Sequence, residues 1–255
     1  MDNSQHFLSS KFNNFLKFNN YLISARYFKS MRGGELLGRG EPLEREAFVA
    51  SMIGASGVGK STLAKLLQLA GVAEFTPTVS DRPLRPIELD DPPVDRIFRS
   101  PAAFDRLEKA GKFLTTKPRY RARYAVLYIK KPPAGKIPMM VLKPWLIYDV
   151  RAYYPNLQVY HIETRGSLLP GRMRKRGQLQ EDIDNRMWEH GAEVIESRQL
   201  ADHSIDNNGP IEETLRQLRR QLIADYTAFQ IMAGNVSPAG DNATMEPYDA
   251  TESFA

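Results

Sequence analysis

A glycine-rich loop with a lysine and a serine occupies residues 54–61, GASGVGKS, and follows the pattern G-x-x-x-x-G-K-[ST]. Its glycines let backbone N–H groups turn inward around phosphate oxygens, and a helix beginning after it adds partial positive charge. In such a loop Lys60 neutralises the β- and γ-phosphates, and the Ser61 hydroxyl binds Mg²⁺. An apolar segment precedes the loop and a leucine-rich segment follows it, which is the strand-loop-helix context this chemistry requires. The motif predicts a nucleotide polyphosphate site, and it leaves open whether a phosphoryl group is transferred.

A second anion site is predicted in TVSDRPLRPIE, residues 78–88. Arg82 and Arg85 lie three residues apart beside prolines that stiffen the loop. Planar guanidinium groups suit the bidentate capture of a phosphate monoester. On its own such a pair is also typical of a solvated surface loop. Together with the glycine-rich loop it predicts the binding site of a phosphoryl acceptor.

A third basic segment, RMRKRG at residues 172–177, precedes a predicted helix that carries Arg186. A mobile lid of this composition would bring several positive charges over a bound triphosphate. Those charges would stabilise the phosphoryl group during transfer, and the closed lid would exclude water. The alternative is a surface helix with solvated basic residues, and the glycine-rich loop favours the lid.

Strand-like and helix-like segments alternate through the middle of the chain, which predicts a parallel α/β sheet that would position these loops. We expect strands at residues 48–53, 138–142 and 157–162, and a short strand ending near residue 205. Helices are expected to begin at residues 60, 101, 168, 180 and 210. The helix at residue 101 has a capping serine and a proline in its first turn, both of which favour helix entry.

The composition sets limits on the function. With 255 residues and 42% hydrophobic content, the chain can bury one core of ordinary domain size. The absence of cysteine excludes disulfides, thiolate zinc sites and thiol nucleophiles, and is compatible with a reducing compartment, so we expect a cytoplasmic protein. A net charge of +5 favours anionic partners without choosing among them. No apolar run approaches the roughly 18 to 20 residues of a membrane span.

The two ends differ in composition from the middle. Residues 1–45 repeat aromatic side chains at spacings of three and four among basic residues, which predicts a basic amphipathic helix. A targeting or membrane-surface segment has this composition, which leaves an organelle address open; we prefer a packing arm or a poorly ordered extension. We therefore expect a domain at residues 46–226 and a disordered, Gly-, Asn-, Pro- and Asp-containing tail at residues 227–255.

Basic residues interleave with tyrosines over residues 117–131. A nucleic-acid surface has this composition, because positive charge follows the backbone and aromatic rings stack on bases. The alternative, which we prefer, is a solvated hairpin over the acceptor site. We therefore expect small phosphorylated molecules, and not nucleic acid, as partners.

The order of these motifs resembles the guanylate kinase family of nucleoside monophosphate kinases, over roughly residues 46 to 223. GASGVGKSTL stands at the phosphate loop, TVSDRPLRPIE where that family has its arginine-rich monophosphate segment, and RMRKRG where it has its lid. DRIFRSPAAFDRLEKAGKFL matches an acidic-aromatic segment, a helix and an A-G-x-F-L ending. The resemblance implies a P-loop NTPase-like parallel sheet flanked by helices, with a small acceptor-binding subdomain and a helical lid.

The resemblance also implies an ATP-dependent, Mg²⁺-requiring transfer of a phosphoryl group to a nucleoside monophosphate, with GMP as the first acceptor to try. The ATP-binding residues that it implies are Gly54, Ala55, Ser56, Gly57, Val58, Gly59, Lys60, Ser61, Thr62 and, near the adenine, Asn207. The implied acceptor-binding residues are Thr78, Arg82, Arg85 and Tyr124. The implied catalytic residues are Lys60, Arg172, Arg176 and Arg186, with Ser61 on the metal.

Two departures from the family pattern concern the acceptor. Thr115 falls near the position at which the family has a glutamate that reads guanine. Lys143 stands where the family has an aspartate pair. A base edge left without its polar partners is poorly discriminated, so guanine specificity stays open. Two alternatives follow: a ribose 1,5-bisphosphate phosphokinase, from a group that resembles guanylate kinases but reads no base, or a non-catalytic guanylate-kinase-like binding module. Nothing in the sequence indicates the oligomeric state.

Overall fold

The computed structural model describes residues 41–84, 88–89, 92–119 and 121–235. The expectations for residues 1–40, for Arg85 and for residues 236–255 lie outside the described residues. Within this part of the chain, no helix is long and apolar enough to cross a membrane.

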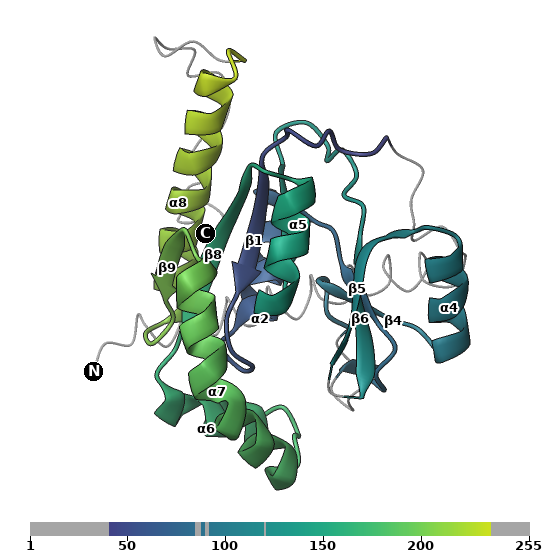
Figure 1. The fold of residues 1–255 in the computed structure, drawn as a ribbon. Helices are drawn as coiled ribbons and strands as arrows, with labels where there is room; N and C mark the ends of the chain where they lie inside the picture. Colours follow the sequence, from purple (N-terminus) through teal and green to yellow (C-terminus); the bar gives the residue numbers. More distant parts are fainter. Residues whose placement is uncertain (1–40, 85–87, 90–91, 120, 236–255) are drawn as a thin grey trace.

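A five-stranded sheet in the order β2-β7-β1-β8-β9 forms the centre of the molecule (Figure 1). Its strands are β1 (Val49–Ile53), β2 (Ala73–Phe75), β7 (Ile137–Val141), β8 (Leu157–Glu163) and β9 (His203–Asp206). All four neighbouring pairs are parallel. Every residue of β1 and β7 is buried, because both faces of a parallel sheet are covered. The strands predicted at residues 48–53, 138–142 and 157–162 and near residue 205 are thereby confirmed.

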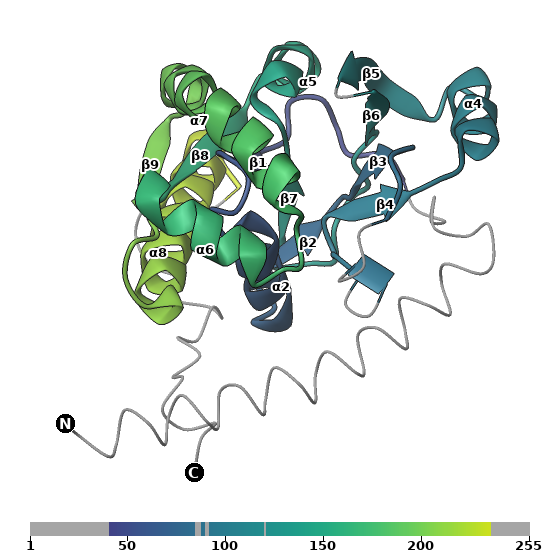
Figure 2. The same cartoon turned by 90° about the horizontal axis from the view of Figure 1, so that it is seen from below.

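Helices cover both faces of this sheet (Figure 2). Helices α2 (Lys60–Leu69) and α8 (Ile211–Met232) pack on one face, and α5 (Ile147–Tyr153) lies on the other. Helix α7 (Gln180–Leu200) contributes to both cores, with Ile183 on the side of α2 and Leu200 on the side of α5. Alternate residues of β1 separate accordingly: Ala50 and Met52 join the core under α2, whereas Val49 and Ile53 join the core under α5.

A smaller sheet of order β4-β3-β6-β5 stands beside the central one (Figure 1). It contains β3 (Thr78–Ser80), β4 (Arg96–Phe98), β5 (Phe113–Arg119) and β6 (Ala122–Leu127), and α4 (Pro101–Lys109) packs on it. Strands β5 and β6 pair antiparallel and form a hairpin. The oxygen of Ser100 accepts the backbone N–H of Ala103 at 3.3 Å, which is the helix entry that the sequence predicts.

A helical segment connects β8 to α7. It comprises the 3₁₀ turn η3 (Gly166–Leu168) and α6 (Leu169–Arg174), and Gly177 (φ 70°) ends it before α7 begins. A second 3₁₀ turn, η2 (Pro144–Leu146), leads from β7 into α5. We call the segment from η3 to the end of α7, residues 166–200, the lid.

The carboxyl-terminal helix is longer than predicted. A boundary at residue 226 is wrong, because α8 continues to Met232. The physical reason is aromatic packing: the rings of Tyr226 and Phe229 lie 5.4 and 5.7 Å from that of Phe48 and close the core at this end. At the other end, the N–H of Leu43 donates to Ile129 O at 2.9 Å, so residues just before 46 also belong to the domain.

Candidate active site

The glycine-rich loop joins β1 to the amino terminus of α2, and its glycines are required by close approach. At Gly59 (φ 104°) an added Cβ would lie 2.5 Å from Asn207 Nδ2, and at Gly54 (φ 134°) it would lie 2.6 Å from Ile162 O. No side chain therefore fits at either position. Gly59 is also the N-cap of α2, where no side chain caps the helix, so the amino-terminal end of α2 is suited to an anion.

Lys60 is folded back onto this loop. Its ammonium donates to Gly54 O at 2.5 Å and to Ala55 O at 2.8 Å. Burial, and next the nearby ammonium of Lys143, lower the pKa of Lys60 from 10.5 to about 7. A polyphosphate would supply the negative charge that restores the charged form of this lysine.

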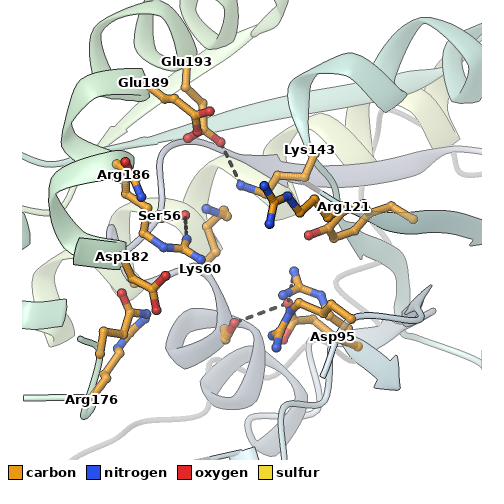
Figure 3. A pocket seen from close by; sticks show the side chains of 18 of the residues that line it. Ser56, Lys60, Asp95, Arg121, Lys143, Arg176, Asp182, Arg186, Glu189 and Glu193 are labelled. Atoms are coloured by element: carbon orange, nitrogen blue, oxygen red, sulfur yellow. Dashed lines mark hydrogen bonds and ion pairs between the residues drawn. The ribbon is translucent and has the colours of Figure 1, made fainter. Parts of the chain in front are cut away.

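A cavity of about 580 Å³ brings most of the predicted residues together (Figure 3). The predicted residues that line it are Ser56, Gly57, Gly59, Lys60, Ser61, Arg82, Tyr124, Arg176 and Arg186. They come from three separate places: the phosphate loop, the small sheet and the lid. Its volume is within the range of small-molecule sites.

Arg82 is held in place at the small-sheet side of this cavity. Its guanidinium makes two hydrogen bonds to the carboxylate of Glu88, at 2.9 and 2.5 Å, and lies over the ring of Phe98. Asp81, the residue before Arg82, is held by Arg123. The backbone N and the Nε of Arg123 donate to the carboxylate of Asp81 at 2.6 and 2.7 Å. The fork of Arg82 thus holds the two oxygens of a carboxylate, and two oxygens of a phosphate monoester could be bound by the same pair of N–H groups.

The lid is docked on the phosphate loop. Arg186 Nη1 donates to Ser56 Oγ at 2.6 Å. Met173 and Leu169 of α6 pack within 3.6 Å of the Cβ position of Gly57. Burial, and next the charge of Arg172, lower the pKa of Arg176. The lid arginines 176 and 186 therefore face the same cavity as Lys60.

Arg172 and Asn207 lie elsewhere than predicted. Arg172 does not line the cavity and donates to Thr164 Oγ1 at 3.3 Å and to Asn207 O at 3.0 Å. Asn207 is 2% exposed, and its amide is used on both sides: Nδ2 donates to Val58 O at 2.6 Å and Oδ1 accepts from Thr214 at 2.9 Å. Asn207 therefore supports the phosphate loop from behind and is not among the residues that line the cavity.

Two predicted hydroxyl residues also have other positions. Thr78 is buried and donates to the backbone oxygen of Asp95 at 3.3 Å, so it holds β4 and does not face the acceptor. Thr62 is exposed on α2, outside the cavity lining. Gly54, Ala55 and Val58 likewise do not line the cavity; the carbonyls of the first two accept Lys60 and that of the third accepts Asn207.

Ser61 and Asp95 have the chemistry of a Mg²⁺ site. Ser61 Oγ donates to Asp95 Oδ2 at 3.3 Å, and Asp95 is 0% exposed. The other oxygen of Asp95, Oδ1, has no hydrogen-bond partner among the described residues. Mg²⁺ prefers oxygen ligands and is held by one or two carboxylates together with substrate phosphates, so these two residues fit it. The described residues contain no group of three or more His, Cys, Asp or Glu side chains arranged for a metal.

Thr115 is committed to another contact. Its hydroxyl donates to Asp149 Oδ2 at 2.5 Å, and Lys117 Nζ donates to Oδ1 of the same carboxylate at 3.0 Å. Burial opposes ionisation of Asp149, but these two hydrogen bonds hold the pKa of its carboxyl below the usual value. Neither Thr115 nor Asp149 is among the residues that line the cavity.

Several cavity residues were not predicted. Sequence reasoning missed Asp95, Arg96, Arg121 and Lys143, together with the acidic residues of α7 that face the cavity, Glu181, Asp182, Glu189 and Glu193. Asp95 opens the acidic-aromatic segment, which was the available signal. Arg121 has a positive φ of 58°, unusual for a residue with a side chain, at the tip of the hairpin. The α7 acids recur at helical spacing and carried no signal until the cavity was known.

Comparison with known proteins gives a likeness of fold. No protein-family model matches this sequence, and no curated protein matches it. Among solved structures, the chain is similar to guanylate kinase from Anaplasma phagocytophilum, with a TM-score of 0.50 and 15% identity over 76% of this chain and 98% of that chain. At this identity the likeness concerns the fold. The chain therefore has a guanylate-kinase-like α/β fold, with the mostly parallel, helix-flanked sheet of P-loop NTPases that the sequence predicts.

Proposed function

We propose that this protein is a Mg²⁺-dependent kinase that transfers the γ-phosphoryl group of ATP to a small phosphate monoester, with GMP as the first acceptor to test. One observation carries the proposal: the phosphate loop, Arg82 and two lid arginines line a single cavity of about 580 Å³. Phosphoryl transfer depends on positioning and electrostatic stabilisation, and this arrangement provides both.

The residues have distinct tasks in this scheme. The loop amides and Lys60 hold the β- and γ-phosphates. Ser61 and Asp95 are the residues that would hold Mg²⁺, and the bound ion would neutralise charge on the phosphates. Arg82 binds the acceptor phosphate. An oxygen of that phosphate attacks the γ-phosphorus, the bond from this phosphorus to the β,γ-bridging oxygen breaks, and ADP leaves. Arg176 and Arg186, which the lid places over the same cavity, stabilise the charge in transit.

An acceptor panel tests the proposal. ADP release would be measured with GMP, dGMP, AMP, UMP, CMP and ribose 1,5-bisphosphate in the presence of Mg²⁺-ATP. Turnover that depends on one of these acceptors, and that Lys60→Met abolishes, supports the kinase. ATP binding without turnover on any acceptor would instead favour a non-catalytic binding module.

A base-free acceptor is the second candidate, and the acceptor side of the cavity favours it. Thr115 is held by Asp149, whereas Arg82, Arg96 and Arg121 all line the cavity. Three arginines suit a second phosphate better than the N–H edge of guanine, which needs an acceptor group. Preference for ribose 1,5-bisphosphate over GMP in the same panel would select this alternative.

A further inference from the structure

Lys143 follows the central strand β7 at the edge of the sheet that carries the phosphate loop. Its neighbour Leu142 donates its N–H to Met52 O of β1 at 3.0 Å, one residue before the end of that strand. Strands β1 and β7 are parallel, so Lys143 and the glycine-rich loop leave the sheet at the same carboxyl edge. Ligands of open α/β sheets bind at this edge.

The side chain of Lys143 points into the cavity and is held there by the lid (Figure 3). Its ammonium donates to Glu193 Oε1 of α7 at 2.9 Å, and the two side chains are 15% and 11% exposed. Both residues line the same cavity as Lys60. The pair therefore links β7 to the lid helix across the space proposed for the phosphates.

Lys143 lies among charges of both signs. Burial lowers the pKa of Lys143, and Glu193 only partly offsets this, while Arg96 and Arg186 lower it further. Although burial opposes it, Lys143 and Lys60 hold the pKa of Glu193 below its usual value, so this carboxyl is ionised. Seven cationic and five acidic side chains line the cavity, so its lining has an excess of positive charge. An added polyphosphate would be stabilised by the cations among them, including Lys60, Lys143 and Arg186.

We propose that Lys143 is a second phosphate-binding lysine of this site, and that Glu193 competes with the phosphates for its ammonium. When a polyphosphate binds, Lys143 exchanges the Glu193 carboxylate for phosphate oxygens, and the tie between β7 and α7 is released. The proposal rests on the proposed function only in taking the glycine-rich loop as the polyphosphate site. It assigns a role to a lysine that stands where the family resemblance leads one to expect acidic residues.

A structural role for the pair gives a different expectation. A buried ion pair kept only for packing loses stability when either partner is removed, and both removals should affect ligand binding alike. Competition instead requires the two removals to have opposite signs. Loss of Lys143 removes a charge-assisted contact with the phosphate, whereas loss of the Glu193 charge removes its competitor.

Binding of inorganic tripolyphosphate, measured by calorimetry at pH 6 without Mg²⁺, tests this. We expect Lys143→Met to weaken binding about 10- to 100-fold, the range for one charged hydrogen bond. Lys143→Arg should remain within about threefold of wild type, because it keeps the charge. Glu193→Gln should tighten binding several-fold, and it should have little effect in the Lys143→Met background.

Three controls keep the outcomes separate. Thermal unfolding of each variant shows whether it is folded, and Glu193→Gln tests the competition even if Lys143→Met is unstable. If Lys60→Met weakens binding while Lys143→Met and Glu193→Gln both weaken it or both leave it unchanged, Lys143 is a structural residue and the proposal is wrong. If Lys60→Met itself leaves binding unchanged, the loop is not the polyphosphate site, and the proposed function is lost with it.

Discussion

The donor side of the cavity is formed mainly by backbone groups, and the acceptor side is formed mainly by side chains. The donor side is backbone: Gly54 and Gly59 have positive φ and no room for a Cβ, and Asn207 supports the loop from within the core. The acceptor side is a set of side-chain pairs on a small sheet, such as Arg82 with Glu88 and Asp81 with Arg123. A single substitution cannot change the geometry of the loop backbone without disrupting it, whereas a single substitution can change one charge of a side-chain pair. The donor side should therefore tolerate little substitution, and the acceptor side is where specificity can diverge on one fold.

The largest expected effect is on the donor side, at the loop lysine. Lys60→Met should lower kcat by about 100-fold or more, the scale of removing one group that stabilises the transition state. Exposed Lys109 of α4 offers a matched control, and Lys109→Met should leave kcat unchanged. Steady-state ADP release measures both. A Lys60→Met enzyme with near-normal kcat would show that the donor side does not act on phosphates.

Alanine substitutions at two glycines distinguish a steric clash from backbone strain. Gly59→Ala should prevent ATP binding and also lower the free energy of unfolding, because its Cβ would meet Asn207 Nδ2. Gly111 also has a positive φ, 63°, but an added Cβ there meets nothing within 4 Å. Gly111→Ala should therefore cost only about 1 to 2 kcal/mol of stability and leave ATP binding intact. Equal binding by the two variants, measured by calorimetry beside urea unfolding, would contradict the backbone account.

The acceptor side should respond in KM alone. Arg82→Lys replaces the planar fork by a single ammonium, so we expect the acceptor KM to rise about tenfold while the ATP KM stays unchanged. Arg106→Lys, at an exposed position of α4, is the matched control and should change neither constant. If both KM values rose together in Arg82→Lys, the donor and acceptor sides would not be separate binding sites.

The smallest expected effect is a pH dependence of anion binding at the donor side. The pKa of Lys60 is about 7, and a bound anion stabilises the charged form and raises it. Affinity should therefore be highest below pH 7 and fall by up to about tenfold per unit as pH rises through 7. Inorganic sulfate is a suitable ligand because its own charge is constant over this range. Lys60→Arg, which stays protonated, should have a weaker pH dependence, and an identical profile would exclude Lys60 as the titrating group.

Much of the fold could be predicted because its signals are local. Buried parallel strands read as continuous apolar runs, and the helix at residue 101 carries its own cap in Ser100. The three-residue strands β2, β3 and β4 are too short to have a periodicity, and α5 begins without a side-chain cap. These elements were missed for that reason. The helix expected at residue 168 begins one residue later, after a 3₁₀ turn.

The phosphate loop was readable from the sequence alone, because eight consecutive residues encode a backbone shape through their glycines. The neighbours of that loop were decided by tertiary structure. Arg172 and Asn207 bear the right chemistry for a nucleotide, yet the packing of the lid and of β9 turns both toward the back of the loop. Lys143 and Glu193 are 50 residues apart, and only the folding of α7 over the edge of the sheet brings their charges into one cavity. Local spacing determines a backbone motif, whereas contacts between distant side chains depend on how whole elements pack.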